Sequence, residues 1–386
     1  MRVCIVYDCL FPYTVGGAER WYRNLAERLA AEGHDVTYLT LRQWERGEQL
    51  DLDPRIRVLE AGPRMALYTG SGRRRILPPI LFGLGVLARL LREGRRYDVV
   101  HTCAFPYFSL LAAALAAPLG RFALVSDWFE VWSEDYWRDY LGGAAGRVGS
   151  LVQRLCARVP QRANCFSQLH AARLRAEGLR GPLTVLRGLY GELAPPATAV
   201  AADPVVLFAG RLIPEKQAPL AVEAIALARE RVPELRGELF GDGPERAAVE
   251  AAISAHGLDG VVHTRGFAAA ETLDDAMRSA LCVLLPSRRE GYGMVVVEAS
   301  ARATPSVVVA GEDNAASELV EDGVNGAVAA HADAETIADA IVSVHDGGFA
   351  MRERTAAWYA AHAEELSLDT SLAQVLDGYR AAIAGG

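Results

Sequence analysis

Lys216 is the residue whose type is hardest to attribute to chance, because it is the only lysine among the 40 basic side chains of this chain. All the others are arginines, so a retained lysine indicates a site that needs a compact ammonium with three donors rather than a planar fork. A phosphate group is the ligand that fits such a donor. A surface lysine without a role is the alternative, and the neighbouring sequence weighs against it.

The residues around Lys216 indicate the elements that hold it. Residues 204–210 form a short apolar run ending in glycine, and residues 219–228 carry the apolar stripe of a helix. In open parallel sheets, ligands bind at the carboxyl ends of strands, where helix N-termini offer free N–H groups to anions. We therefore expect Arg211 and Lys216 to flank an anion-binding loop between a strand and a helix.

A second loop with residues suited to binding spans 287–293 and follows the apolar run 282–285. Gly291 and Gly293 would let the backbone approach a ligand closely, and their N–H groups would open the next helix. The alternative is that the two glycines only make a turn.

Two carboxylates accompany this second loop: Glu290 lies within it, and Glu298 lies two turns into the expected helix. A carboxylate in the loop can accept hydrogen bonds from sugar hydroxyls, and one on the helix can hold a vicinal diol such as a ribose. Two solvated surface carboxylates are the alternative, but the apolar run 294–297 argues against a solvated face.

Length and composition exclude several protein classes. A chain of 386 residues, 51% apolar and 23% charged, fits a soluble globular protein of two domains. Its net charge of −8 argues against a nucleic-acid-binding protein, because binding to phosphate backbones needs concentrated positive charge. The six cysteines form no C-x-x-C pair, and the apolar run after Met1 is too short for a signal peptide. We expect a cytoplasmic protein with small, reduced core cysteines.

Apolar runs and helical stripes alternate along the whole chain, which indicates parallel sheets with right-handed crossovers. The alternation restarts after a Pro- and Ala-rich stretch, 191–203, that is typical of a linker. We predict an α/β fold with two Rossmann-like domains, residues 1–190 and 204–365, facing each other across a cleft. The expected strands are 2–7, 36–41, 56–59, 98–101, 123–126, 204–210, 236–240, 261–264, 282–285 and 306–309.

Gly16 and Gly17 precede the first expected helix and, with the 210–216 loop, would line that cleft. Neither loop matches the G-x-G-x-x-G dinucleotide fingerprint, and the Walker motif does not occur. A plain dinucleotide dehydrogenase is therefore disfavoured.

Together these motifs resemble the retaining glycosyltransferases of the GT-B fold, family 4. The resemblance covers nearly the whole chain. It implies a nucleotide-diphosphate sugar held mainly by the second domain, an acceptor held by the first, and a C-terminal helix, 366–386, that crosses back to the first domain. Four groups of residues carry it, in the family's order and at roughly its spacing: Gly16-Gly17, Gly210-Arg211 with Lys216, Gly241-Asp242-Gly243-Pro244, and Glu290 with Glu298.

The resemblance also implies roles for single residues. Arg211 and Lys216 would bind the diphosphate, Glu290 would hold the sugar, and Glu298 would bind the ribose; the catalytic set is Glu290, Arg211 and Lys216. Gly17 would approach the phosphates or the acceptor from the first domain. The remaining expected donor contacts are Gly16, Gly210, Gly241, Gly243, Phe267, Gly291, Tyr292, Gly293 and Met294.

Retention with an α-linked product, by a front-face route, is likewise implied by the resemblance. Arg211, Lys216 and helix N-termini would stabilise the charge that builds on the departing diphosphate, so we predict that neither a divalent metal ion nor a cofactor is needed. A double displacement would need a carboxylate close to the anomeric carbon, and no residue is an obvious candidate. Asp51 and Asp53 match the Asp-x-Asp metal motif of the other glycosyltransferase fold, but they precede a strand and are interpreted as a turn.

One residue that many relatives have is missing. They place a histidine after the strand that ends here near residues 126–130, and this chain has none between His101 and His170. Asp127 or Glu130 could take its place, as could His101 at the end of the preceding strand. Each is equally explained as a polar residue at a strand end.

The expected donor carries UDP or GDP, and the expected acceptor is a glycan, a lipid-linked saccharide or a small molecule. Two other functions stay open: a nucleotide-sugar 2-epimerase on the same fold, and a non-catalytic subunit that binds a nucleotide sugar. A pyridoxal-phosphate phosphorylase would need a second lysine and is disfavoured.

Two segments of the first domain bear on its partners. Residues 73–96 form an apolar stretch flanked by arginines, which suits a core helix with solvated ends or, as the less favoured alternative, peripheral contact with the inner face of an anionic membrane. Residues 128–140 are rich in aromatic side chains, which suit either sugar recognition or helix packing.

Overall fold

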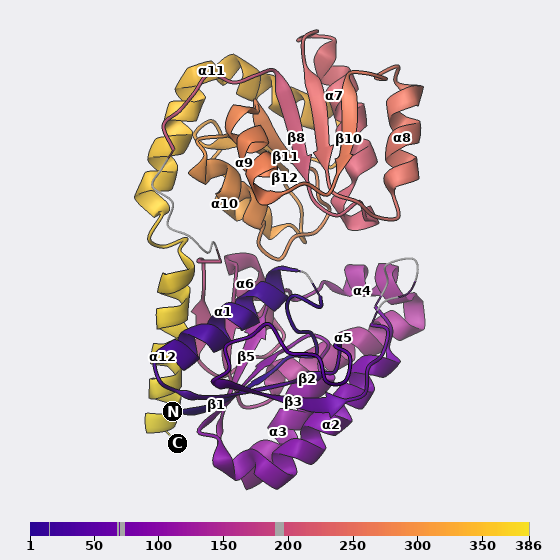
Figure 1. Ribbon diagram of the computed structural model, residues 1–386. Coiled ribbons are helices and arrows are strands. Elements are labelled where there is room, and N and C mark those ends of the chain that lie inside the picture. The colour runs from indigo at the N-terminus through magenta and orange to yellow at the C-terminus, as the bar shows by residue number, and fades with distance from the viewer. Residues whose placement is uncertain (15, 68, 70–73, 190–196, 386) are drawn as a thin grey trace. The chain divides into compact units, whose positions relative to one another are not determined.

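The structure is a computed structural model that describes residues 1–14, 16–67, 69, 74–189 and 197–385. The chain divides into two compact units: Met1–Leu189 with Asp369–Gly386 is unit 1, and Tyr190–Leu368 is unit 2. Each unit consists of one sheet with helices packed on it (Figure 1). Residues 191–196 of the expected linker and Arg73 of the arginine-flanked stretch lie outside the described residues.

Unit 1 is built on a seven-stranded sheet in the order β3-β2-β1-β4-β5-β6-β7. The strands are β1 (Arg2–Val6), β2 (Asp35–Leu41), β3 (Ile56–Gly62), β4 (Val99–Cys103), β5 (Ala123–Trp128), β6 (Arg162–Cys165) and β7 (Leu183–Val185). The helices are α1 (Gly17–Ala31), α2 (Leu77–Glu93), α3 (Phe108–Gly120), α4 (Glu134–Leu141), α5 (Gly143–Arg158), α6 (Gln168–Ala176) and α12 (Leu368–Ala384), with the 3-10 turn η1 (Gly94–Arg96).

Unit 2 repeats this plan with a six-stranded sheet in the order β10-β9-β8-β11-β12-β13. The strands are β8 (Val205–Ala209), β9 (Arg236–Phe240), β10 (Val262–Gly266), β11 (Cys282–Leu285), β12 (Ser306–Val309) and β13 (Gly326–Ala329). The helices are α7 (Ala218–Arg229), α8 (Arg246–Ala255), α9 (Ala270–Ser279), α10 (Met294–Ala301) and α11 (Ala334–His362), with 3-10 turns η2 (Pro214–Lys216) and η3 (Ala315–Leu319).

Neighbouring strands in both sheets pair in parallel, which confirms the predicted α/β class. Three strands were not predicted from the sequence: β6, β7 and β13. Two of them have four residues and one has three, and β6 is Arg-Ala-Asn-Cys, so none presents the long apolar run that identifies a buried strand.

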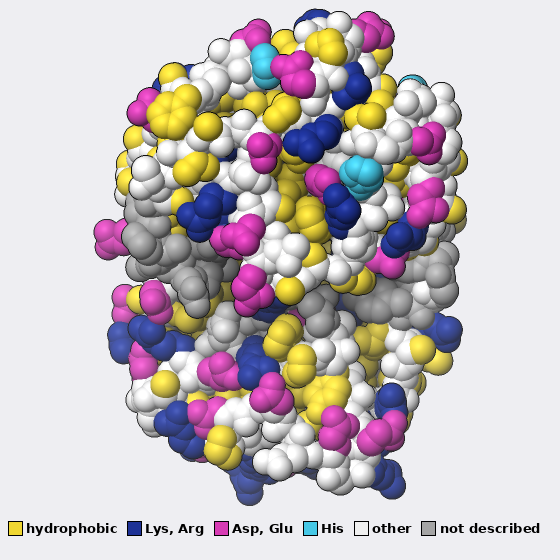
Figure 2. Space-filling model, turned by 45° about the horizontal axis from the view of Figure 1, so that its top comes forward, with side chains coloured by type: hydrophobic (Ala, Val, Ile, Leu, Met, Phe, Trp, Pro, Cys, Tyr) yellow, Lys and Arg dark blue, Asp and Glu magenta, His cyan; other side chains and the backbone are white. Residues whose placement is uncertain are grey.

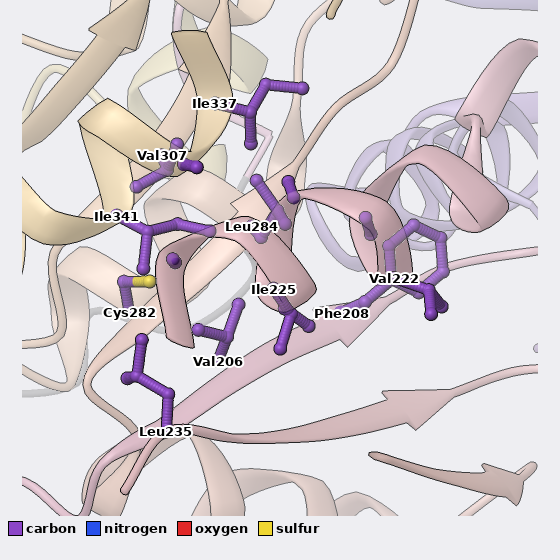
Figure 3. Packing of buried hydrophobic residues seen from close by; sticks show 14 of the residues in the cluster. Val206, Phe208, Val222, Ile225, Leu235, Cys282, Leu284, Val307, Ile337 and Ile341 are labelled. Atoms are coloured by element: carbon purple, nitrogen blue, oxygen red, sulfur yellow. The ribbon is translucent and has the colours of Figure 1, made fainter. Parts of the chain in front are cut away.

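The core of unit 2 explains why its central strands read as continuous apolar runs. Val206 and Phe208 of β8 point into the layer formed with Ile225 of α7 and Ile341 of α11 (Figure 3). Leu207, between them, packs in a separate cluster. Because successive side chains of a strand point to opposite faces, β8 is buried on both faces, as parallel sheets covered by helices require.

The C-terminal helix α12 is part of unit 1 and is attached to it through a buried polar network. The hydroxyl of Tyr379 and Nδ1 of His101 are 2.5 Å apart. His101 Nε2 lies 2.8 Å from Asp127 Oδ1, and Asp127 Oδ2 accepts a hydrogen bond from Trp21 Nε1 at 2.7 Å. Buried polar groups are costly unless paired, so this network ties α12 to β4, β5 and α1.

The aromatic stretch of unit 1 packs around a glutamine. Trp132 and Trp137 are buried, and Gln153 Oε1 accepts from the backbone N–H of Trp132 at 3.0 Å and from Nε1 of Trp137 at 3.2 Å. The hydroxyl of Tyr107 donates to the same oxygen at 2.9 Å. The structure therefore favours helix packing over sugar recognition for these residues.

Charged side chains of both signs are interspersed on the face of the molecule drawn in Figure 2. All six cysteines are buried and free, and burial raises the pKa of the Cys4 thiol to about 12. Within the described parts of the chain, no helix combines the length and apolarity needed to cross a bilayer.

We predict that Tyr379→Phe lowers the free energy of unfolding of unit 1 by about 1 to 3 kcal/mol, because it leaves a buried nitrogen of His101 without its partner. The matched control is Tyr13→Phe, which removes an exposed 2.8 Å bond to Glu48 and should cost at most about 0.5 kcal/mol. Urea denaturation followed by tryptophan fluorescence measures both, and equal losses would contradict the role given to Tyr379.

Candidate functional site

The topology of unit 2 brings two sequence-predicted loops together. β8 and β11 are neighbours in the sheet, but β8 is followed by β9 on one side and β11 by β12 on the other. The loops that leave the carboxyl ends of β8 and β11 therefore diverge and leave a crevice at this switch point, which is where open α/β sheets bind ligands. These are the 210–216 and 286–293 loops.

Lys216 and Glu290 meet at this switch point. Lys216 ends the 3-10 turn η2, and its Nζ donates to Glu290 Oε1 as an ion pair, with 21% of the lysine side chain and 11% of the glutamate side chain exposed. The backbone N–H of Arg288 donates to the carbonyl of Glu215 at 3.0 Å, which fastens the two loops to each other. Arg211 lies in the same loop as Lys216 and is exposed.

A third glycine-bearing loop, after β9, packs backbone against backbone on the first. Gly241 has φ of +125°, and a Cβ there would lie 1.9 Å from the carbonyl oxygen of Gly210. A Cβ on Gly243 would lie 2.3 Å from the carbonyl oxygen of Leu212. Glycine is required at both positions for this approach, so Gly241 packs on Gly210 and Gly243 packs on Leu212 of the first loop.

The loop after β11 leads directly into helix α10. Gly293 precedes the helix with φ of +101°, and its carbonyl accepts from Val296 N–H at 2.9 Å. Met294 is the first helical residue, and Tyr292 is buried. The N–H groups at the start of a helix have no intrahelical partner and carry partial positive charge, so this helix start can bind an anion.

Asn314 holds the Glu290 loop in place, and sequence reasoning missed it. Its Nδ2 donates to the carbonyls of Ser287 and Val309, both at 2.9 Å, and the residue is 1% exposed. The backbone N–H of Glu290 donates to the carbonyl of Asp313 at 3.1 Å, and the Glu290 carbonyl accepts from the N–H of Ala315 at 2.9 Å. These two bonds flank Asn314 in the sequence. A polar residue shortly after the predicted strand 306–309 was the signal that could have identified it.

Two further charged residues shape the electrostatics of the site. Burial lowers the pKa of the Arg289 guanidinium to about 10, although the carboxylates of Glu290 and Asp313 oppose that shift. Arg289 therefore stays charged at neutral pH, and Glu290 lies near two cations. Burial, together with the charge of Glu215, raises the pKa of the Glu245 carboxyl.

The other predicted donor contacts are placed as follows. Phe267 follows β10 and is 81% exposed, next to Gly266, which pairs with Gly241 in an isolated bridge. Glu298 is the fifth residue of α10 and is half-buried. Gly16 and Gly17 belong to unit 1, where they begin α1.

Two of the three unit 1 candidates for the missing histidine, Asp127 and His101, are buried inside the protein. Asp127 and His101 are fully buried and contact each other, and Asp127 Oδ1 also accepts from Asn164 Nδ2 at 2.8 Å. Glu130 accepts from Trp132 Nε1 at 2.6 Å. The hypothesis that Asp127 or His101 replaces the histidine as a ligand contact is therefore wrong, because neither side chain is accessible.

The Asp51-x-Asp53 segment forms bends before β3, as interpreted from the sequence. Asp53 accepts from the backbone N–H of Arg55 at 2.9 Å and pairs with its guanidinium, which lowers the pKa of the Asp53 carboxyl to about 2. Over the described ranges of the chain, no group of three or more His, Cys, Asp or Glu side chains is arranged to hold a metal ion.

We predict that Gly293→Ala lowers the stability of unit 2 by about 3 kcal/mol, because the new Cβ adds overpacking to left-handed backbone strain. It would lie 2.6 Å from the Cβ of Ala316. The control is Gly323→Ala, at φ of +74° with open space around it, which should cost about 1 kcal/mol. Urea denaturation followed by circular dichroism compares them; losses of equal size would show that the Gly293 contact is not tight.

Two family descriptions match this chain in consecutive segments. The family "Glycosyl transferases group 1" matches residues 194–359, and "Glycosyltransferase Family 4" matches residues 15–187. The two matches fall on the sheet-bearing parts of unit 2 and unit 1.

Among characterised relatives, an alpha-D-kanosaminyltransferase of Streptomyces kanamyceticus is 34% identical over 153 residues, which are 40% of this chain and 39% of the relative. A D-inositol 3-phosphate glycosyltransferase of Streptomyces griseus is 31% identical over 189 residues, 47% of this chain and 39% of the relative. The chain thus spans about two fifths of the length of the curated relatives it matches.

Solved structures match over the full length. Sucrose-phosphate synthase from Thermosynechococcus elongatus superposes with a TM-score of 0.78 at 18% identity and full coverage of both chains. The Anabaena protein HepE, in complex with UDP, gives a TM-score of 0.74 at 20% identity, with 99% of this chain and all of that chain covered. These likenesses confirm the two-domain α/β fold that the resemblance implied.

Proposed function

We propose that this chain, which belongs to the group 1, family 4 glycosyltransferases, transfers a sugar from a nucleotide-diphosphate sugar to an acceptor. The observation that carries the proposal is the meeting of Lys216 with Glu290 at the switch point of unit 2. Around this pair lie glycine loops that pack closely on neighbouring loops of unit 2, and a helix start that favours an anion.

The diphosphate of the donor would bind to Lys216, Arg211 and the N–H groups at residues 291–294. Without a donor, the ammonium of Lys216 is balanced by Glu290. A diphosphate brings more negative charge than one carboxylate, and an ammonium has three donors to share. Lys216 would therefore move largely onto the diphosphate and release one oxygen of Glu290.

The released oxygen of Glu290 would accept hydrogen bonds from hydroxyls of the donor sugar. Asn314 and the bonds on both sides of Glu290 keep its backbone fixed while the side chain changes partner. Glu298, half-buried on α10, would hold the ribose hydroxyls. Binding of the phosphates and binding of the sugar are thereby linked through one ion pair.

In the transfer step, the bond between the anomeric carbon and the diphosphate oxygen breaks, and a bond from the acceptor hydroxyl oxygen to that carbon forms on the same face. The acceptor proton passes to the departing phosphate oxygen, so the products are an α-linked glycoside and a nucleoside diphosphate. Lys216, Arg211 and the α10 amides stabilise the negative charge that builds on the leaving group.

The donor nucleotide is proposed to be UDP or GDP, and the acceptor a glycan, a lipid-linked saccharide or a small molecule. The UDP complex of HepE, which shares the fold, supports UDP. The similarity to a D-inositol 3-phosphate glycosyltransferase supports a small hydroxylated acceptor. We propose that the reaction takes place in the cytoplasm.

We predict that Lys216→Ala lowers kcat/KM for donor turnover roughly 100- to 1,000-fold, because a charge aimed at the leaving group is lost. Lys216→Arg should recover less than about a tenth of the wild-type value, since a planar fork does not replace a compact ammonium. Release of nucleoside diphosphate is measured with a panel of UDP and GDP sugars.

The control for these variants is Arg231→Ala, which removes an exposed cation beyond the far end of α7 that pairs with Asp339 at 2.8 Å. It should leave kcat/KM unchanged. If Lys216→Ala is as active as Arg231→Ala, the site is not where the diphosphate binds. A product with an epimerised sugar would show that the protein is an epimerase rather than a transferase. Binding of the nucleotide sugar without turnover would show that it is a binding subunit.

Metal independence gives a separate prediction. Turnover should change less than about twofold when EDTA is added, because Lys216, Arg211 and helix amides supply the positive charge at the leaving group. The measurement is the rate before and after chelation and after added Mg²⁺ or Mn²⁺. Loss of activity with EDTA and its recovery with Mg²⁺ would contradict a metal-free mechanism.

A further inference from the structure

An exposed apolar surface lies on three helices of unit 1, and the donor site of unit 2 does not use it. We call it the leucine face and define it by eight aliphatic side chains that are each between 50% and 68% exposed. They are Leu77, Leu84, Leu91, Leu115, Leu119, Val148, Leu151 and Leu155. Single exposed leucines are ordinary, but a group of this size on a soluble domain marks a contact surface.

The leucines of α2 and α3 form neighbouring stripes. On α2, Leu77, Leu84 and Leu91 repeat every seven residues and so share one side of the helix. A Cβ on Gly83 of α2 would meet Phe108 of α3 at 2.7 Å, and one on Gly94, next after α2, would lie 3.3 Å from Gly120, so the helices run parallel in contact.

On α3, Leu115 and Leu119 lie seven and eleven residues after Phe108, and therefore on the side of α3 that meets α2. The exposed stripes of the two helices are thus adjacent. The buried residues of α2, including Phe82, Val86 and Leu90, occupy the opposite side and pack into the unit. One side of α2 is therefore part of the core, and the other side exposes leucines.

α5 adds a third stripe on the same face of the sheet. Each of the connections β3 to β4, β4 to β5 and β5 to β6 moves across the sheet in the same direction, and right-handed crossovers place their helices on one face. α1, whose connection runs the other way, lies on the opposite face and is bonded to α12 through Arg28 and Asp369 at 2.8 Å (Figure 1).

The helices of the leucine face carry more arginines than carboxylates, although the whole chain is acidic. Residues 77–121 carry five arginines and two carboxylates, and residues 143–158 carry three arginines and no carboxylate, in a chain whose net charge is −8. Arg92, Arg121 and Arg147 are exposed and make no ion pair within the described residues. The other five arginines are Arg89, Arg95, Arg96, Arg154 and Arg158.

From this combination we propose that the leucine face docks unit 1 on the surface of an anionic lipid bilayer. Amphipathic helices with leucines on one side and arginines beside them lie in the interface, with aliphatic chains among the acyl groups and guanidinium groups at lipid phosphates. Anionic lipids also attract basic segments at a distance of about a Debye length. A second copy of this chain fits less well, because pairing two such faces would bring arginines together.

The proposal does not depend on glycosyl transfer, because it is tested by binding alone. The full chain is floated with vesicles of phosphatidylcholine, or of phosphatidylcholine mixed with phosphatidylglycerol. Binding is expected on the phosphatidylglycerol vesicles, little on phosphatidylcholine alone, and release at about 1 M salt, where charge attraction is screened within about 3 Å.

Two triple variants separate the apolar and the charged contributions. Leu84→Ser with Leu91→Ser and Leu115→Ser removes the stripes of α2 and α3; Arg92→Gln with Arg121→Gln and Arg147→Gln removes unpaired cations. Either set should lower the bound fraction on anionic vesicles roughly tenfold or more. All six positions are exposed, so the melting temperatures should stay near the wild-type value.

The control combines Ile383→Ser on α12, across the sheet in unit 1, with Phe349→Ser in unit 2; both are exposed apolar residues, and binding should not change. The proposal is overturned if the wild type ignores anionic vesicles, or if the leucine variant binds them as well as the control. It is equally overturned if sedimentation velocity shows a dimer that the leucine variant dissociates while vesicles stay unbound, which would make the face a protein interface.

Discussion

The arrangement of the site depends on one property of parallel sheets, which is that all strands end at the same edge. Lys216 and Glu290 are 74 positions apart, yet their loops leave adjacent strands, β8 and β11, at that edge. After β8 the chain crosses to β9, and after β11 it crosses to β12 on the other side. No crossover connection therefore fills the space between the two loops. β8 and β11 are buried on both faces, which makes this edge of the sheet rigid. The rigid strand ends fix the positions of the two loops.

Charge is balanced within the site before any ligand binds. The Lys216 ammonium and the Glu290 carboxylate satisfy each other, and the buried Arg289 guanidinium keeps its charge nearby although burial lowers its pKa to about 10. In a partly buried place, such an ion pair has a smaller net desolvation penalty than either ion would have alone. Under the proposed function, the affinity for an anionic donor would be a difference between two favourable states, and Glu290 would link sugar binding to phosphate binding.

Sequence patterns predicted the fold class, ten of the strands and the loops of the candidate site, because buried parallel strands have long apolar runs and glycines mark close backbone approach. They did not predict β6, whose sequence Arg-Ala-Asn-Cys has no apolar period. They could not show that Lys216 pairs with Glu290 or that Asn314 anchors it, since these contacts depend on strand order. For the same reason the burial of Asp127 and His101 in a network with Tyr379 became visible only in the folded structure.

The central claim is that the Lys216 and Glu290 pair opens to receive the diphosphate of a sugar donor. A crystal structure of the full chain with bound UDP or GDP tests this most directly. The account predicts Lys216 Nζ within hydrogen-bonding distance of a phosphate oxygen, the phosphates at the start of α10, and Glu290 turned away from the ammonium. A nucleotide bound elsewhere, or bound at this edge with the ion pair still closed, would contradict it.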